Sequence, residues 1–155
     1  MRTGEKPSLF DSIRGAGTVR SRDGVPDIHG MPCDVIEQHG HPYMERFYLL
    51  GQKMAGGSSM RYHHIVASDD EVMHDHPWDF VSIILSGSYL ETTSAGEEQY
   101  GTGTVLVRPA EQLHRLTLVD GPVWTMVVLG PPRRRWGYQT PTGWQHWSDY
   151  QSVTQ

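Results

Sequence analysis

Residues 80–92 read Phe-Val-Ser-Ile-Ile-Leu-Ser-Gly-Ser-Tyr-Leu-Glu-Thr, two short runs of apolar and β-branched residues on either side of a Ser-Gly-Ser turn. Neither run is long enough for a helix of ordinary length, and neither shows the spacing of an amphipathic helix. Short runs of this composition, bounded by turn residues, are typical of β-strands. This stretch therefore predicts two consecutive strands joined by a tight turn.

The same pattern recurs on both sides of this stretch. The further predicted strands are Phe47–Leu50, Met60–Val66, Thr104–Val107, Leu113–Val119 and Val123–Leu129. Glycine-containing turns separate them, among them Gly101-Thr102-Gly103 and Asp120-Gly121-Pro122. Seven short strands at this spacing predict an all-β protein, built as an antiparallel sandwich or barrel.

The segments before and after these strands differ in composition. Residues 1–45 are rich in Gly and Pro and have little periodicity, so they predict a loosely structured N-terminal arm, with a turn of helix near Leu9–Arg14. We expect this arm to lie on the domain or on a neighbouring subunit. Residues 46–130 hold the predicted barrel. Residues 131–155 predict a C-terminal cap that packs its aromatic side chains over the barrel; these are Trp136, Tyr138, Trp144, Trp147 and Tyr150.

Composition excludes several classes of protein. The 155 residues carry a net charge of −5, which argues against a nucleic-acid partner, and the arginines of 133–135 are expected to be solvated. The single cysteine, Cys33, excludes an intrachain disulfide framework and a cysteine-based zinc ribbon. No apolar run approaches the roughly 20 residues of a spanning helix, so no membrane partner is expected. The polar start of the chain favours a cytoplasmic location.

Three of the nine histidines have the spacing that a metal ion needs. Side chains alternate along an extended backbone, so His74 and His76 point to the same face and Asp75 points away, toward solvent. His114, at the start of a later predicted strand, is the natural third ligand. The sequence therefore predicts one divalent metal ion per chain, held by these three imidazoles.

At this point the sequence resembles the cupin superfamily, small jelly-roll barrels built as a double-stranded β-helix. The first motif of the superfamily is matched by His74, His76 and Gly87, and the second by Gly103, Pro109 and His114. The resemblance covers about residues 58–130, and Phe80 stands where the superfamily has a glutamate ligand. A looser likeness to uncharacterised cupin-like proteins of phages and bacteria is carried by Ser68–Asp70, His74–Phe80, Gly121–Thr125 and Trp136–Tyr138.

A site of three histidines without the glutamate is similar to the thiol dioxygenase branch, such as cysteine dioxygenase. The resemblance implies non-haem iron(II) and oxidation of a small anionic or thiol-type substrate by dioxygen. Zinc, nickel or manganese would also suit three neutral imidazoles. The resemblance also implies a homodimer. Two alternatives stay open: a non-catalytic module that binds a metal and a ligand, and an interaction protein that uses the arm and the cap.

Three further residues are candidates for a catalytic role. Arg61 and His63 alternate on one predicted strand and would share its inner face, where they would bind an anionic substrate or donate a proton. Asp79 follows His76 by three residues. It would ligate the metal if the strand bulges, orient a ligand histidine from behind, or remain at the surface.

Overall fold

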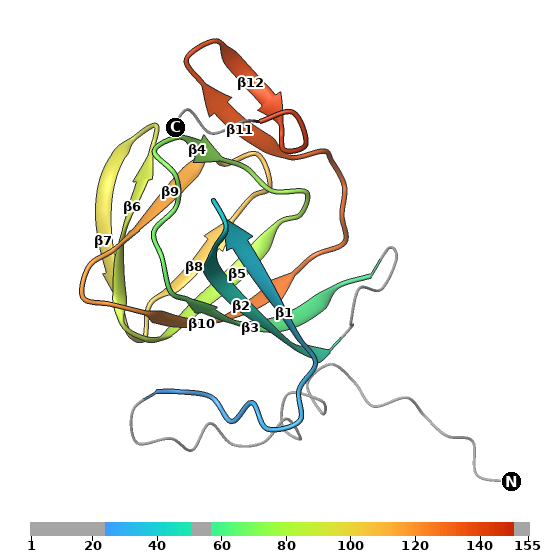
Figure 1. Cartoon of the computed structure of the whole chain (residues 1–155), viewed down its shortest axis with the longest axis vertical. Coiled ribbons are helices and arrows are strands. Elements are labelled where there is room, and N and C mark those ends of the chain that lie inside the picture. The colour runs from blue at the N-terminus through green and yellow to red at the C-terminus, as the bar shows by residue number, and fades with distance from the viewer. Residues whose placement is uncertain (1–23, 51–56, 151–155) are drawn as a thin grey trace, which may run out of the picture.

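The computed structural model describes residues 24–50 and 57–150 of the chain (Figure 1). These residues contain twelve strands and no helix. The strands are β1 (Cys33–Gln38), β2 (His41–Leu50), β3 (Ser59–Ile65), β4 (Met73–His74), β5 (Phe80–Ser86), β6 (Ser88–Thr93), β7 (Gly96–Gly101), β8 (Val105–Arg108), β9 (His114–Leu118), β10 (Val123–Leu129), β11 (Gly137–Thr140) and β12 (Gly143–His146). All seven predicted strands are present, and the all-β prediction is confirmed. No helix that could cross a membrane occurs in these described residues.

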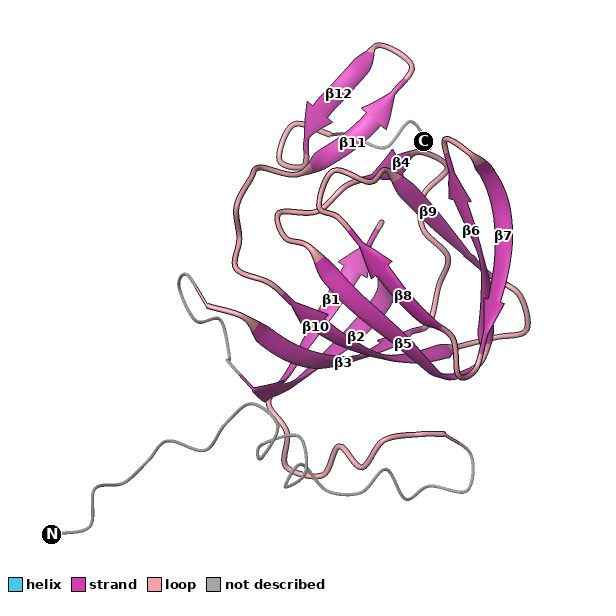
Figure 2. Ribbon diagram, turned by 180° about the vertical axis from the view of Figure 1, so that it is seen from behind, coloured by secondary structure: helices cyan, strands magenta, loops and turns pink. Residues whose placement is uncertain are grey.

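The strands form two six-stranded antiparallel sheets that face each other (Figures 1 and 2). Sheet A has the order β1-β2-β3-β10-β5-β8, and sheet B has the order β12-β11-β4-β9-β6-β7. Strands far apart in the sequence are neighbours in both sheets. This jelly-roll arrangement brings the short strand β4 next to β9 and so places His74 opposite His114.

The turn between β5 and β6 shows why the stretch that predicted the fold contains a glycine. Gly87 has a φ of +89°, and a Cβ atom at this position would lie 2.8 Å from the carbonyl oxygen of Pro122. Only glycine fits a positive φ and so close a backbone approach without strain. The turn therefore lets β5 leave sheet A and β6 enter sheet B within one residue.

The prediction of a loosely structured arm is wrong for residues 33–45. They form β1 and the first half of β2, which are paired from Cys33–Phe47 to Gln38–His41. The two residues between the strands, His39 and Gly40, both have a positive φ, of 53° and 75°. This is the geometry of a tight two-residue hairpin turn, so the glycine here joins strands instead of marking a loose segment.

The hydrophobic core has two parts. Between the sheets, Ile84, Tyr89, Leu106 and Val123 pack together. On the outer face of sheet A, a second cluster around Trp124 is covered by the segment 24–32, whose apolar side chains are Val25, Ile28 and Met31. This part of the predicted arm lies on the domain. Residues 1–23, with the predicted helical turn, lie outside the described residues.

The C-terminal segment is a hairpin that extends sheet B, at the end of the molecule opposite segment 24–32 (Figures 1 and 2). β11 pairs with β4 on one side and with β12 on the other. A Cβ atom at Gly137 would lie 1.9 Å from the carbonyl oxygen of Gln145, so glycine is required where the two strands meet. Trp144 and Trp147 remain 41% and 51% exposed, so the prediction that the whole aromatic segment is covered is wrong for these two side chains.

Candidate metal centre

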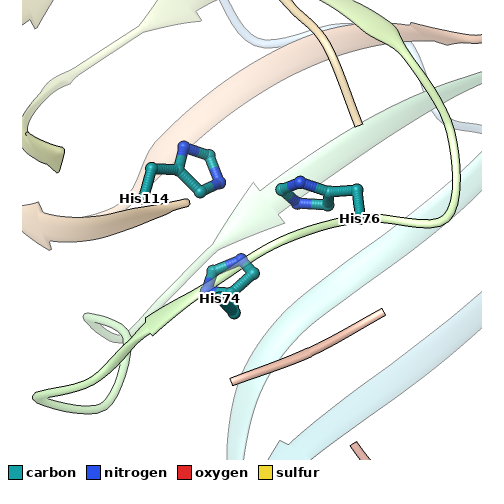
Figure 3. A group of neighbouring side chains, drawn as sticks. All are labelled: His74, His76 and His114. Atoms are coloured by element: carbon teal, nitrogen blue, oxygen red, sulfur yellow. The ribbon is translucent and has the colours of Figure 1, made fainter. Parts of the chain in front are cut away.

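The structure brings together the three histidines that the sequence singled out (Figure 3). His74 ends β4, His76 follows it in extended chain, and His114 begins β9 directly opposite His74. One ring nitrogen from each lies within 4.8 Å of the others, and the ring centroids are 4.9–5.0 Å apart. Three imidazole nitrogens at this separation can converge on one ion at the bond lengths that divalent transition metals take.

Phe80 occupies the wall of the site where the cupin pattern has a carboxylate. Its ring lies 4.7 Å from the ring of His76 and 6.2 Å from that of His114. Among the described residues, the group that could hold a metal consists of imidazoles alone. A bound divalent ion would therefore keep its full positive charge, which favours an anion as a further ligand.

A buried carboxylate holds His114 in place. Glu91 of β6 accepts a hydrogen bond from His114 Nδ1 at 2.6 Å and pairs with Arg108, whose Nε lies 3.0 Å away. Burial by itself would raise the pKa of Glu91, but the hydrogen bonds from His114 and Arg108 outweigh it and lower the pKa to about 2. The ionised carboxylate keeps the proton on Nδ1 and leaves Nε2 of His114 free to bind a metal ion.

The other two imidazoles lie in surroundings that favour their neutral, metal-binding form. Burial lowers the pKa of His74. The negative charge of Asp69, whose carboxylate oxygen is 3.8 Å from His74 Nδ1, raises it but does not outweigh burial. Burial also lowers the pKa of His76 well below its usual value, and the nearby His74 and His114 add to the effect. Neutral imidazoles can bind a cation without first releasing a proton.

The three histidines line a cavity of about 570 Å³ between the sheets. Arg46 of β2 and His63 of β3 line the same cavity and are direct partners across the two strands. Arg46 Nε and His63 Nε2 are buried and have no hydrogen-bond partner among the described residues. Burial lowers the pKa of His63 well below its usual value, and the charges of Arg46 and Arg61 lower it further.

Arg61 does not line the cavity. Its side chain is buried, at 7% exposure, and its guanidinium carbon lies 5.1 Å from the ring centre of Tyr48 and 5.2 Å from that of Trp78. The prediction that Arg61 contacts a substrate is not supported by this placement. Arg46, which the sequence analysis missed because β2 was predicted to begin only at Phe47, presents a guanidinium to the cavity instead.

Asp79 lies outside the group of three histidines and at the surface, which is the third of the placements expected for it. The strand does not bulge toward the site. Its exposed carboxylate accepts hydrogen bonds from the backbone N–H of Ala110 at 2.8 Å and from Arg133, at 2.6 and 3.1 Å. The hydrogen bond from Arg133 is the largest cause of the lowered pKa of Asp79. At the surface, the carboxylate links the loop after β8 to the segment after β10.

Asp75 is also not where the sequence placed it. It is 2% exposed, and its carboxylate accepts hydrogen bonds from Gly137 N at 2.7 Å and from Trp144 Nε1 at 3.0 Å. Arg134 completes the set with an ion pair of 2.9 Å. The side chain points away from the histidines, as alternation predicts, but the C-terminal hairpin covers that face, so Asp75 is buried and not solvated.

No known protein-family profile and no curated protein matches this sequence. Solved structures do match. A cupin-2 domain from Rhodospirillum rubrum has a TM-score of 0.61 at 12% identity, over 80% of this chain and 85% of that one. A cupin 2 conserved barrel domain protein from Rhodopseudomonas palustris has a TM-score of 0.59 at 14% identity, over 74% and 81%.

A structure described as Fe(II) HppE is also similar. It has a TM-score of 0.54 at 15% identity, over 74% of this chain and 64% of its own. Identities this low support a shared fold and say nothing of a shared reaction. The chain therefore has the fold of these cupin barrels, a double-stranded β-helix built from two facing antiparallel sheets. Between the sheets, the nitrogens of three histidines are close enough together to hold a divalent metal ion.

Proposed function

We propose that this cupin is a mononuclear non-haem iron(II) enzyme of the dioxygenase type, which oxidises a small anionic or thiol-type substrate. The observation that carries the proposal is the convergence of His74, His76 and His114 within 4.8 Å on the wall of a cavity large enough for a small molecule. That Fe(II) HppE shares the fold is consistent with iron in such a barrel. When bound, iron(II) supplies redox chemistry and open positions for dioxygen and substrate.

Residues that line the cavity would position the substrate. Arg46 and His63 line the cavity, and the guanidinium of Arg46 would pair with a carboxylate or thiolate. Burial and the neighbouring arginines lower the pKa of His63 well below its usual value, which favours a neutral ring that would accept or donate a proton. Phe80 and the other apolar lining side chains give the site a largely apolar wall.

Metal analysis of the untagged protein, reconstituted anaerobically with iron(II), tests the proposal. We expect about one iron per chain in the wild type and loss of iron in His76→Ala. His146→Gln is the matched control, because His146 hydrogen-bonds to Ser148 outside the cluster, and it should keep the iron. Oxygen uptake with a panel of small thiols and carboxylates, measured on the same samples, should follow the iron content.

Two results would count against the proposal in different ways. Absence of metal from the reconstituted wild type would overturn it and favour a binding or interaction module. Stable iron binding with no oxygen uptake across the panel would favour a non-catalytic metal- and ligand-binding barrel. The homodimer expected from the resemblance stays a prediction, and sedimentation equilibrium of the same protein tests it.

A further inference from the structure

The cavity has two ends of different chemistry. At one end lie Arg46 and His63, on neighbouring strands of sheet A. At the other end lie aromatic side chains of the C-terminal hairpin and its flanks, Trp136, Tyr138 and Trp147. A cavity that offers a cation at one end and flat apolar rings at the other is matched to a ligand with the complementary two parts.

At the cationic end, the positive charge has no partner within the described residues. Arg46 forms no ion pair there, and its buried Nε has no hydrogen-bond partner. Three of the four carboxylates that line the cavity are already engaged: Asp69 accepts a hydrogen bond from Leu116 N at 2.6 Å, Asp70 pairs with His39, and Glu91 holds His114 and Arg108. The fourth, Glu37, forms no ion pair with Arg46 in the described part of the chain. A guanidinium left without a counter-ion in a cavity wall is stabilised by an anionic ligand.

At the aromatic end, the rings are stacked in pairs. Trp136 and Trp147 lie 6.0 Å apart at an interplanar angle of 12°, and Tyr138 stacks on Tyr150 at 4.0 Å and 24°. Trp147 is 51% exposed although it lines the cavity, so part of its ring is open to a ligand. A planar ligand would extend this stack in the offset or edge-on geometry that aromatic rings prefer.

The histidine cluster lies between the two ends. The ring of His74 is 6.5 Å from that of Trp136 and 6.0 Å from that of Tyr138. On the side of sheet A, His63 lines the same cavity as His76. A ligand held at both ends would therefore pass its middle atoms in front of the three imidazoles.

We propose that the substrate is an aryl-bearing anion, with its aromatic body against Trp136 and Trp147 and its anionic group on Arg46 and His63. The cavity of about 570 Å³ falls in the range that takes ligands with a ring system. This inference rests on the proposed function for the position of the reacting atoms beside the histidines. The ligand class itself rests on the cavity alone.

Binding of three simple probes tests the ligand class. They are 3-phenylpropionate, propionate and 3-phenylpropan-1-ol, which carry both parts, the anion alone and the ring alone. Titration calorimetry on the metal-free and the zinc-loaded protein should give at least about tenfold tighter binding for 3-phenylpropionate than for either partial probe. Equal affinity for propionate and 3-phenylpropionate would overturn the inference, and so would failure of all three probes to bind.

Variants separate the two ends. Arg46→Gln should weaken binding of 3-phenylpropionate about tenfold and leave 3-phenylpropan-1-ol unchanged. Trp147→Ala should weaken both aryl probes and leave propionate unchanged, whereas Val107→Ala, at an exposed position outside the cavity, should change nothing. An Arg46→Gln protein that folds, by near-ultraviolet circular dichroism, and binds all three probes as the wild type does would overturn the inference.

The two proposals fail separately. Metal content decides the proposed function, whereas probe binding to the metal-free protein decides the ligand class. A protein that takes up no iron but prefers 3-phenylpropionate would refute the enzyme and keep the ligand. An iron-loaded protein that consumes oxygen but shows no preference among the probes would do the opposite.

Discussion

Replacing Asp75 with asparagine should loosen the C-terminal hairpin, because this one carboxylate holds it from three directions. Its oxygens accept hydrogen bonds from Gly137 N and Trp144 Nε1 and pair with Arg134, all at 2.7–3.0 Å. An asparagine of the same shape keeps one oxygen and turns an amide N–H₂ toward donors. The change is therefore nearly neutral in volume and acts through hydrogen bonds and charge.

The size of the effect follows from these contacts. If the remaining oxygen serves Gly137, the new amide faces Trp144 Nε1 and Arg134. One hydrogen bond to a charged acceptor, worth about 1.5–3 kcal/mol, is then lost together with one ion pair. Arg134 is 26% exposed, so hydration of its guanidinium compensates for part of the lost ion pair. We expect Asp75→Asn to lower the free energy of unfolding by about 3 kcal/mol.

Urea unfolding followed by tryptophan fluorescence measures this change, and amide hydrogen exchange locates it. Protection should fall first in β11 and β12, since the lost contacts hold these strands. Asp149→Asn is the control, because the exposed Asp149 accepts only a hydrogen bond from its neighbour Ser148. A loss of under about 0.5 kcal/mol, or exchange that rises evenly over the barrel, would refute the role given to Asp75.

Two further predictions concern other carboxylates. Glu91→Gln should weaken metal binding about 10–100-fold, because it removes the carboxylate that orients His114. Arg108→Met leaves the contact between Glu91 and His114 intact and should weaken metal binding far less. Competition with a chelator measures the metal affinity of both variants. Hydrogen bonds from Arg133 lower the pKa of the exposed Glu111 to about 2, so their stabilising effect is full above about pH 4.5 and is lost as the pH falls toward 2. When the pH is lowered from 6 to 3 at low salt, the free energy of unfolding should therefore fall less for Arg133→Gln than for the wild type. Urea titrations at the two pH values measure both decreases, and equal decreases would contradict this prediction.

The parts of the structure that the sequence predicts are those that depend on local spacing. The alternation of His74 and His76, and the turn glycine at position 87, follow from the two-residue period of a strand and the steric freedom of glycine. The short apolar runs between turn residues predicted the seven strands, and the alternation identified two neighbouring candidate ligands. His114 was found because a second, independent motif of Gly103 and Pro109 precedes it at a fixed spacing.

The parts that were missed depend on which strands become neighbours. Arg46 faces His63 only because β2 pairs with β3, and Asp75 is buried only because β11 pairs with β4 from more than 60 residues away. Nothing in the local spacing distinguishes Arg46 from Arg61, or predicts a cover over Asp75. Glu91 lies in a run that predicts a strand correctly, but its role depends on the pairing of β6 with β9.

The pairing of His74 with His114 has a mechanical consequence. β4 is two residues long, and through it the C-terminal hairpin is joined to the rest of sheet B. An ion held by these two imidazoles would cross-link neighbouring strands and close a loop of about forty residues, as a disulfide does. Loss of the metal ion would thus empty the histidine site and also weaken the attachment of the C-terminal hairpin, which lines the cavity. The melting temperature of the barrel should then rise with metal concentration, as for any ligand that binds only the folded chain.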